Sequence, residues 1–355
     1  MDTAMAAQAR RIEPCVLPLD GASHPGTNGE WLGGAVFGSA AYTNEQLTQR
    51  IGAQAAAGCA VVDMAPLSAA HGFAELWRVW GDGPVVQYRR GDLTWSVDRS
   101  LLFAHLTLDE RAFGDGTHCA LEPAAHAIYR RLFALLADTG FSHPIRFWNY
   151  LPRINVDEDG LERYRHFNIG RHAAFVEAQR PTDAAPPAAC ALGCRGSAMT
   201  AIVLAGRTPP IAIENPRQVS AYRYPSQYGP RAPTFSRAAL YRRGAHALLT
   251  ISGTASIVGH ETLHVGDVAG QVDESLRNLE AVVDAANAAA GQPLFSVDGL
   301  KMKGYVRNRA HADIVRRQLL LRLPQTPVPL VQAEICRENL LFEVEAAGAA
   351  EGAPA

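Results

Sequence analysis

The chain repeats one order of predicted elements, and this repeat constrains its fold more than any other feature of the sequence. In the first half, apolar residues at helical spacing over 126–136 precede a strand over 145–151 and a second helix over 161–167. The second half repeats this helix–strand–helix order between 272 and 321, and it ends in two strands between 330 and 344. The order predicts an α+β fold of two related halves, each a mixed β-sheet with helices packed on one face.

Changes in composition indicate where the halves begin and end. A stretch rich in Pro and Ala over 178–190 has no apolar period and is typical of a linker. The last residues are rich in Ala and Gly and have nothing to bury, which predicts a disordered tail. The predicted segments are an N-terminal extension (1–29), a first domain (30–177), a linker (178–200), a second domain that carries the functional site (201–346) and the tail (347–355).

Charge and composition exclude several classes of protein. Lys and Arg total 33 against 35 Asp and Glu, a formal net charge of -2, which excludes a generally basic nucleic-acid-binding protein. No apolar run approaches the roughly 18 residues of a membrane helix, and no apolar stretch follows the N-terminal arginines as it would in a signal peptide. The six scattered cysteines predict reduced thiols in a cytoplasmic protein. The close pair Cys190 and Cys194 lacks a second pair that would complete a zinc site, so no metal is predicted.

The segment 260–264, His-Glu-Thr-Leu-His, matches the zinc-peptidase motif H-E-x-x-H. That motif needs a helix, because its two histidines must lie one turn apart. Here an apparent strand over 248–253 precedes the motif, and Gly259 and Gly266 bracket it. Residues four apart in a strand are separated by about 13 Å. The context therefore predicts a surface turn, and a zinc peptidase is the least favoured function.

The stretch from Asn215 to His260 contains six arginines and four tyrosines but no Asp or Glu. Four prolines in it predict a stiff, shaped loop rather than a flexible basic arm. Arginine forks bind carboxylates and tyrosine hydroxyls can orient them, so this stretch favours a pocket for a small polyanion. A solvated arginine-rich loop and a single-stranded nucleic-acid site remain alternatives. The arginines are Arg217, Arg223, Arg231, Arg237, Arg242 and Arg243.

The last predicted strand supplies a candidate acid. Its period of two places Leu341, Glu343 and Glu345 on one face, and Leu340, Phe342 and Val344 on the other. A carboxyl among apolar neighbours has a raised pKa because burial disfavours its charged form, and it can then act as a general acid. If the strand instead lies at the edge of its sheet, this face is exposed to solvent and the carboxyl has no such role.

Several short blocks resemble the RidA/YjgF family and, more specifically, the chorismatases, which are two-domain relatives of it. The RidA/YjgF pattern is matched by Ile-Ser-Gly at 251–253, Gly-Asp followed by Gln at 266–271, and Asn-Leu at 278–279. The chorismatase pattern is matched by Arg-Phe-Trp-Asn-Tyr-Leu at 146–151, 214–222, Tyr-Gly-Pro-Arg at 228–231, 251–256 and Cys-Arg at 336–337. The resemblance covers roughly residues 30–346 and implies two RidA-like domains, the first of them degenerate.

The resemblance implies an enzyme that cleaves the enolpyruvyl ether of chorismate and releases pyruvate without a cofactor. Glu343 stands where the family has its catalytic acid, and Cys336 matches a pocket cysteine of relatives that form hydroxybenzoate. 3-Hydroxybenzoate is the favoured product, alone or with 4-hydroxybenzoate. The residues expected to bind the substrate are Arg217, Tyr222, Arg231, Thr254, Ala255 and Arg337, with Tyr150 and Arg171 as pocket wall from the first half.

Alternatives to this hypothesis remain open. A hydrolytic chorismatase would use water to give 3,4-dihydroxycyclohexa-1,5-diene carboxylate, and Cys336 would then be a small buried apolar residue. A RidA-like imine hydrolase would need only one arginine for a carboxylate, which the six-arginine stretch argues against. A non-catalytic protein that binds small ligands or nucleic acid is a further alternative. The resemblance implies chorismate as the partner molecule, with neither nucleic acid nor membrane, and a monomer or a RidA-like trimer.

Overall fold

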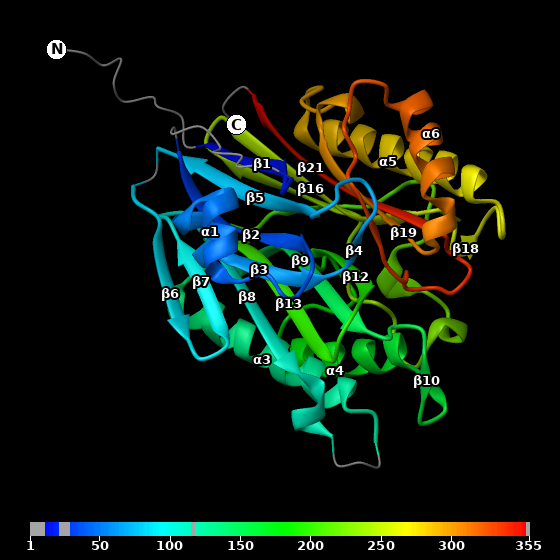
Figure 1. Ribbon diagram of the computed structural model, residues 1–355, viewed down its shortest axis with the longest axis horizontal. Helices are drawn as coiled ribbons and strands as arrows, with labels where there is room; N and C mark the ends of the chain where they lie inside the picture. Colours follow the sequence, from blue (N-terminus) through cyan, green and yellow to red (C-terminus); the bar gives the residue numbers. More distant parts are fainter. Residues whose placement is uncertain (1–10, 21–28, 82, 115–117, 353–355) are drawn as a thin grey trace.

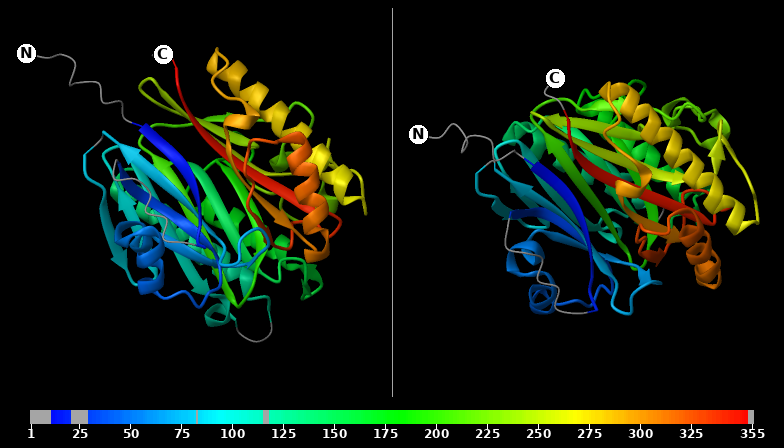
Figure 2. Two further views of the ribbon diagram at one scale, coloured as in Figure 1. Left: turned by 45° about the horizontal axis from the view of Figure 1, so that its top comes forward. Right: turned by 90° about the horizontal axis from the view of Figure 1, so that it is seen from above.

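Three β-sheets meet around one central core in the computed structural model of the chain (Figure 1). The structure describes residues 11–20, 29–81, 83–114 and 118–352. In all three sheets one face points toward the core, and helices cover the opposite face. The three groups of helices therefore lie at the outside of the molecule (Figures 1 and 2).

The first repeat forms a six-stranded sheet with the strand order β12-β9-β13-β8-β7-β6. Its helices α3 and α4 pack against the outer face through a core of Leu, Phe and Ala side chains. A left-handed glycine, Gly140, ends α3 and turns the chain back toward β9. The elements are β6 (Val86–Arg90), β7 (Leu93–Val97), β8 (Leu101–Asp109), α3 (Leu121–Thr139), β9 (His143–Pro152), α4 (Arg163–Glu177), β12 (Ala188–Cys194) and β13 (Ala198–Gly206).

The second repeat forms the same arrangement in a sheet with the order β14-β15-β16-β21-β19-β20-β4. Read backwards from β20, this order matches the first sheet strand for strand, including the parallel pairs β9/β12 and β19/β20. The predicted duplication is therefore confirmed. The elements are β14 (Ile211–Ile213), β15 (Ala238–Arg243), β16 (His246–Ala255), α5 (Val268–Ala290), β19 (Lys301–Val306), α6 (Ala312–Arg322), β20 (Leu330–Gln332) and β21 (Phe342–Glu351), joined by β4 (Ala65–Pro66).

A third unit precedes both repeats. Its four-stranded sheet has the order β1-β5-β2-β3, and α1 and α2 cover its outer face. Thr43 begins α1 with a reciprocal capping box in which its side chain and that of Gln46 bond each other's backbone N–H groups. The elements are β1 (Arg11–Pro18), β2 (Glu30–Gly38), α1 (Asn44–Ile51), α2 (Ala53–Ala57), β3 (Cys59–Asp63) and β5 (Phe73–Trp80).

The central core joins the three sheets. Phe37 and Trp77 of the third unit pack against Trp148 and Tyr150 of β9, with ring centroids 5.6 Å apart for Phe37–Tyr150 and 5.7 Å apart for Trp77–Trp148. Tyr305 of β19 reaches the same core and is fully buried. Each large aromatic side chain buried here contributes about 1.5–3 kcal/mol relative to an exposed one. The units consequently form one packed body.

Three sequence-based expectations about the segment boundaries are corrected. The expected linker 178–200 contains β12, which pairs in parallel with β9 at the edge of the first sheet. The expected disordered tail is part of β21 as far as Glu351, and residues 353–355 lie outside the described part of the chain. Within the expected N-terminal extension, β1 pairs with β5, while 1–10 and 21–28 also lie outside the described part.

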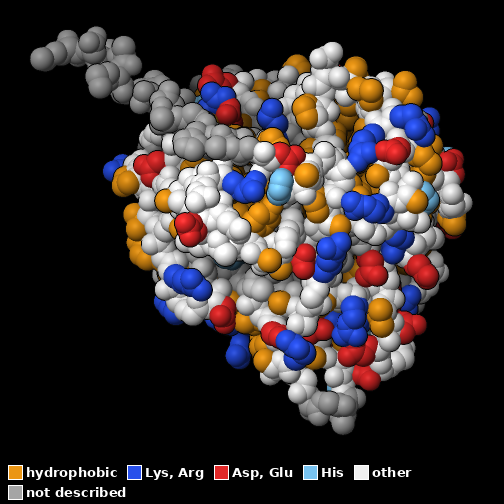
Figure 3. Space-filling model, in the orientation of Figure 1, with side chains coloured by type: hydrophobic (Ala, Val, Ile, Leu, Met, Phe, Trp, Pro, Cys, Tyr) orange, Lys and Arg blue, Asp and Glu red, His pale blue; other side chains and the backbone are white. Residues whose placement is uncertain are grey.

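The exposed surface carries charges of both signs. Lys/Arg and Asp/Glu side chains are intermixed over the face shown in Figure 3, in agreement with the formal net charge of -2. Among the residues that the structure describes, no helix is both long enough and apolar enough to span a bilayer.

Candidate active site

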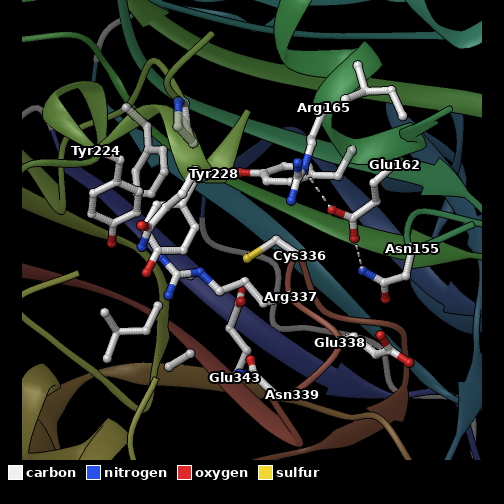
Figure 4. A pocket seen from close by; sticks show the side chains of 18 of the residues that line it. Asn155, Glu162, Arg165, Tyr224, Tyr228, Cys336, Arg337, Glu338, Asn339 and Glu343 are labelled. Atoms are coloured by element: carbon white, nitrogen blue, oxygen red, sulfur yellow. Dashed lines mark hydrogen bonds and ion pairs between the residues drawn. The ribbon is translucent and has the colours of Figure 1, made fainter. Parts of the chain in front are cut away.

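A cavity of about 820 Å³ opens between the two repeats. The start of α4 forms one wall, and the proline-rich stretch that follows β14 forms the other. Tyr224 lies on one side and Glu162 on the other (Figure 4). The floor is made by the end of β16 and by β21. The lining includes Asn155, Glu162, Tyr164, Arg165, Tyr224, Tyr228, Phe235, Arg237, Gly253, Ala255, Cys336, Arg337, Asn339 and Glu343.

Glu343 is the buried acid of this cavity. It lies on β21 between β16 and β19, opposite Ala255 on one neighbouring strand and Tyr305 on the other. The residue is 3% exposed, so the alternative of a solvent-facing edge strand is wrong. Burial, followed by the negative charge of Glu345, raises the pKa of Glu343 to about 8. The carboxyl therefore holds its proton at neutral pH.

Gly253 makes room for the Glu343 side chain. A β-bulge between Ile251 and Thr254 brings the Gly253 backbone against the carboxyl, and a Cβ added at Gly253 would collide with Glu343 Oε1. The Ile-Ser-Gly block therefore ends in glycine at a position where any larger residue would overlap the Glu343 side chain.

We predict that Gly253→Ala displaces the Glu343 carboxyl, because the added methyl group would overlap its Oε1 atom, and that any reaction in which this carboxyl takes part slows by about tenfold. The matched control is Gly299→Ala, whose Cβ would meet only Ser296 Oγ at 3.3 Å. Steady-state kinetics of both variants test this. Equal turnover in the two would show that the position of Glu343 does not depend on Gly253.

A small chamber of about 40 Å³ lies behind the acid and extends the cavity inward. Asn168 and Arg171 of α4 line it, and each is 3% exposed. Asn168 Nδ2 and the Nε and Nη2 atoms of Arg171 make no hydrogen bond of full geometry among the described residues, although the Tyr164 hydroxyl lies near Asn168 and the Tyr129 hydroxyl near Arg171. Arg171 is held by the Thr234 carbonyl and by the faces of surrounding aromatic rings. The chamber is therefore a polar space with unused donors, as a bound polar group requires.

Two further arginines line the main cavity, and each has one buried donor without a partner among the described residues. Arg337 donates from Nη1 to the His260 carbonyl at 2.8 Å, and its guanidinium carbon lies 4.1 Å from the ring centroid of Tyr228. Arg237 donates to the Tyr224 hydroxyl at 2.7 Å. Arg337 Nη2 and Arg237 Nε are buried and unpaired among the described residues. Buried unpaired donors on a cation favour an anionic ligand.

Cys336 lines both the main cavity and the inner chamber, as Glu343 does. Burial, and then the neighbouring Glu343, raise the pKa of Cys336 to about 12, so that the side chain is a thiol at neutral pH. Figure 4 shows its sulfur atom in the cavity, near the labelled Arg337. Cys336 can therefore contact a ligand as a small side chain with a weak S–H donor.

The structure places some of the other expected site residues in the cavity lining and others outside it. Ala255 lines the main cavity, but Thr254 is buried beside it and its hydroxyl donates to the Ser252 carbonyl at 2.8 Å. Tyr150 lies in the central core, with its hydroxyl 3.5 Å from that of Tyr305. Thr254 and Tyr150 are absent from the cavity lining, contrary to expectation.

Arg217, Tyr222 and Arg231 also lie outside the cavity lining. Arg217 donates to Asn278 Oδ1 at 2.6 Å and pairs with Glu274, which fastens the proline-rich stretch to α5. Arg231 is exposed. Arg237, Tyr224 and Tyr228, which do line the cavity, belong to the same arginine- and tyrosine-rich stretch. The sequence thus located the stretch but did not identify the members that face the site.

The H-E-x-x-H segment forms the predicted turn. Glu261–Thr262 is a short strand, β18, paired with β17 (Ile257–Val258) in a two-stranded ribbon. The segment serves the cavity through its backbone, because the His260 carbonyl accepts from both Arg337 and Tyr228. Among the residues that the structure describes, no cluster of three or more His, Cys, Asp or Glu has the geometry of a metal site.

Comparison with known proteins agrees with this geometry. A family model described as chorismatase FkbO/Hyg5-like, N-terminal, matches residues 75–205. A chorismatase from Streptomyces hygroscopicus is 37% identical over 301 residues, which cover 80% of this chain and 84% of the relative. The chain belongs to the chorismatase family.

Two further relatives extend the comparison for this chorismatase. A 3-hydroxybenzoate synthase from Streptomyces hygroscopicus is 39% identical over 234 residues, which cover 62% of this chain and 68% of the relative. A crystal structure of a chorismatase superimposes with a TM-score of 0.82 at 28% identity, covering 96% of this chain and 98% of that one. The protein is therefore an enzyme of the chorismatase family, with an α+β fold that contains two repeats of one arrangement.

Only the second repeat of this chorismatase carries the acid. The strand of the first repeat that corresponds to β21 is β13, and its sequence, AMTAIVLAG, contains no carboxylate. The family match over 75–205 covers that first repeat, whereas Glu343 lies in the second. The first repeat contributes Tyr164, Asn168 and Arg171 as walls, so both repeats are needed to complete the site.

Proposed function

We propose that this chorismatase converts chorismate, releasing pyruvate and a ring product, and that Glu343 is the general acid. One observation carries the proposal: a buried, protonated carboxyl and arginines with unpaired buried donors line the same cavity and its inner chamber. Relatives named chorismatase and 3-hydroxybenzoate synthase support chorismate as the substrate.

The cavity suits a small molecule with two carboxylates. Arg337 and Arg237 offer donors in the main cavity, and Arg171 offers donors at its inner end. When the substrate binds, its carboxylates lose hydrogen bonds to water. A carboxylate that accepts hydrogen bonds from one of these guanidinium groups regains them, and each such charged hydrogen bond contributes about 1.5–3 kcal/mol. The tyrosine rings beside Arg337 provide a flat apolar wall for the six-membered ring of the substrate.

The reaction begins with proton transfer from Glu343 to the methylene carbon of the enolpyruvyl group. The double bond supplies the electron pair for the new C–H bond, and the ether oxygen stabilises the resulting oxocarbenium ion. The C4 hydroxyl oxygen then attacks C3 as the ether C3–O bond breaks, so pyruvate leaves and the hydroxyl proton passes to the Glu343 carboxylate. The resulting epoxide opens at its C4–O bond, and loss of a ring C–H proton as the oxygen is protonated gives 3-hydroxybenzoate without net consumption of water. Capture of the cation by water instead consumes one water and gives the dihydroxycyclohexadiene carboxylate and pyruvate. General acid catalysis contributes about 10²–10⁴-fold.

Incubation of the purified protein with chorismate tests the proposal directly. Pyruvate should form, with 3-hydroxybenzoate as the main ring product, alone or with 4-hydroxybenzoate, when the mixture is separated by chromatography. Pyruvate with the diene diol would support the hydrolytic alternative. Absence of pyruvate, combined with hydrolysis of an imine substrate, would support the RidA-like alternative and contradict the proposal.

Cys336→Ala should move the ring products toward the diene diol while pyruvate release continues. The thiol fills space beside the acid, and its removal lets water approach the cation. The ratio of ring products by chromatography is the measurement, and Cys194→Ala, at a half-buried cysteine outside this cavity, is the control. An unchanged ratio in Cys336→Ala would remove the cysteine from product selection.

A further inference from the structure

Four charged groups form a cluster in the central core, behind the cavity; three of them are buried, and Glu75 is partly exposed. Glu345 accepts from Arg146 at 2.8 Å and from the Tyr305 hydroxyl at 2.9 Å, and its carboxylate lies 3.1 Å from Lys303 Nζ. Lys303 also pairs with Glu75. Glu75 comes from β5, Arg146 from β9, Lys303 from β19 and Glu345 from β21, so all three sheets contribute to this ion cluster.

The charges of the ion cluster balance without Glu343. Its two cations, Arg146 and Lys303, face two carboxylates, Glu75 and Glu345. Glu343 lies two residues from Glu345 on the same face of β21, about 7 Å away along the strand. No ion pair of Glu343 occurs within the described residues. Ionised Glu343 would therefore add a fifth charge, which no ion pair within the described residues offsets.

We propose that the ion cluster, through its fixed Glu345 carboxylate, reinforces burial in keeping the Glu343 carboxyl protonated and poised as an acid, with Glu345 as the positioning residue. The inference rests on the proposed function of Glu343. The fixed negative charge of Glu345 opposes a second negative charge beside it, and the cluster holds Glu345 ionised because Lys303 and Arg146 both contact it. The two carboxyls of one strand face thus take opposite protonation states.

Charged and titratable groups surround Glu343 from each neighbouring element. Glu345 lies on its own strand and Tyr305 on β19, while Cys336 lies on the preceding loop, Cys190 on β12 and Tyr164 on α4. Arg146, Arg237 and Arg307 lower the pKa of Glu343, but burial and Glu345 outweigh them. For Glu345, burial raises the pKa, but Lys303 and Arg146 together bring it to about 2. The raised pKa of Glu343 and the lowered pKa of Glu345 agree with the proposal that Glu343 is the protonated acid and Glu345 the ionised neighbour.

The first test is the pH profile of Glu345→Gln. In the parent enzyme, pyruvate release should decline as the pH rises through about 8, where Glu343 loses its proton. In Glu345→Gln the cluster has one cation in excess, so Glu343 ionises to balance it, and the decline should begin at least about one pH unit lower. A folded Glu345→Gln protein with an unchanged profile would overturn the proposal.

A double variant distinguishes charge balance from simple disruption. Lys303→Met combined with Glu345→Gln removes one charge of each sign, so Arg146 and Glu75 remain as a neutral pair. The pH at which pyruvate release declines should return toward that of the parent enzyme. Should Glu345→Gln fail to fold, Glu75→Gln unbalances the cluster from its more exposed edge and should shift the decline in the same direction. Asp98→Asn, which breaks the separate buried pair with Arg243, is the control and should leave the decline in place.

An infrared measurement separates this inference from the proposed function. The C=O stretch of protonated Glu343, isolated by subtracting the spectrum of Glu343→Gln, reports its titration without any turnover. A downward shift of this titration in Glu345→Gln supports the inference even where pyruvate release does not follow, and that combination would contradict Glu343 as the acid instead. If Glu343 titrates at the same pH in Glu345→Gln as in the parent, the inference is overturned, whether or not pyruvate release changes.

Discussion

Glu343→Gln is expected to lower pyruvate release from chorismate by about 10²-fold or more while the protein still folds. Glutamine matches the size of the buried acid and fits beside Gly253, but its amide cannot transfer a proton to carbon. The rate is measured by coupling pyruvate to its reduction and following the loss of the reduced nicotinamide, and folding is checked by circular dichroism. Near-normal turnover would remove Glu343 from the mechanism.

The same substitution has a predicted effect on stability, and its sign follows from the pKa. The pKa of Glu343 rises from 4.5, its ordinary value, to about 8 in the folded protein. Between these two values the folded protein holds a proton that the unfolded chain has lost, so the contribution of Glu343 is fully present below pH 4.5 and is lost as the pH rises through about 8. Glutamine does not titrate, so Glu343→Gln does not lose stability as the pH rises over this range. Its melting temperature relative to the parent should therefore increase from acidic to alkaline pH.

The repeat and the acid could be predicted from local sequence because each depends on residues close together in the chain. The alternation of Phe342, Glu343, Val344 and Glu345 determines which side chains face the helices and which face the interior, whatever the neighbouring strands are. The helix spacing in both halves is equally local. Local sequence does not determine the burial of Glu343, since burial depends on β21 being an inner strand of its sheet.

The parts that the sequence did not reveal depend on distant partners. Arg217 and Arg337 look equivalent in sequence, because both are arginines in blocks that resemble the family. Arg217 is neutralised by Glu274 on α5, whereas Arg337 lines the cavity and its buried Nη2 has no partner among the described residues. The ion cluster joins Glu75 to Lys303 across a separation of 228 residues. β12 falls within the expected linker because its small residues, AACALGC, lack the polar–apolar alternation that indicates a strand.

Replacement of Arg337 is the second large effect that we expect. Arg337→Met should weaken chorismate binding by about 10²-fold, because it removes a charged donor group that no other residue of the cavity duplicates at that position. Binding is measured by calorimetry in the Glu343→Gln background, where turnover does not consume the ligand. Arg337→Lys, which keeps the charge but loses the planar fork, should give an intermediate affinity.

The matched control is Arg217→Met, at an arginine of comparable exposure whose guanidinium is already paired with Glu274 and Asn278. It should lower the melting temperature, because the buried Glu274 carboxylate loses a partner, yet leave the affinity for chorismate within about twofold. The two variants thus separate an arginine that fastens the proline-rich stretch from one that holds the ligand. If Arg217→Met weakened binding as much as Arg337→Met, recognition would depend on the shape of the whole stretch rather than on the unpaired donor of Arg337. The His260 carbonyl, which accepts from Arg337 and Tyr228, would then be the contact through which that shape is maintained.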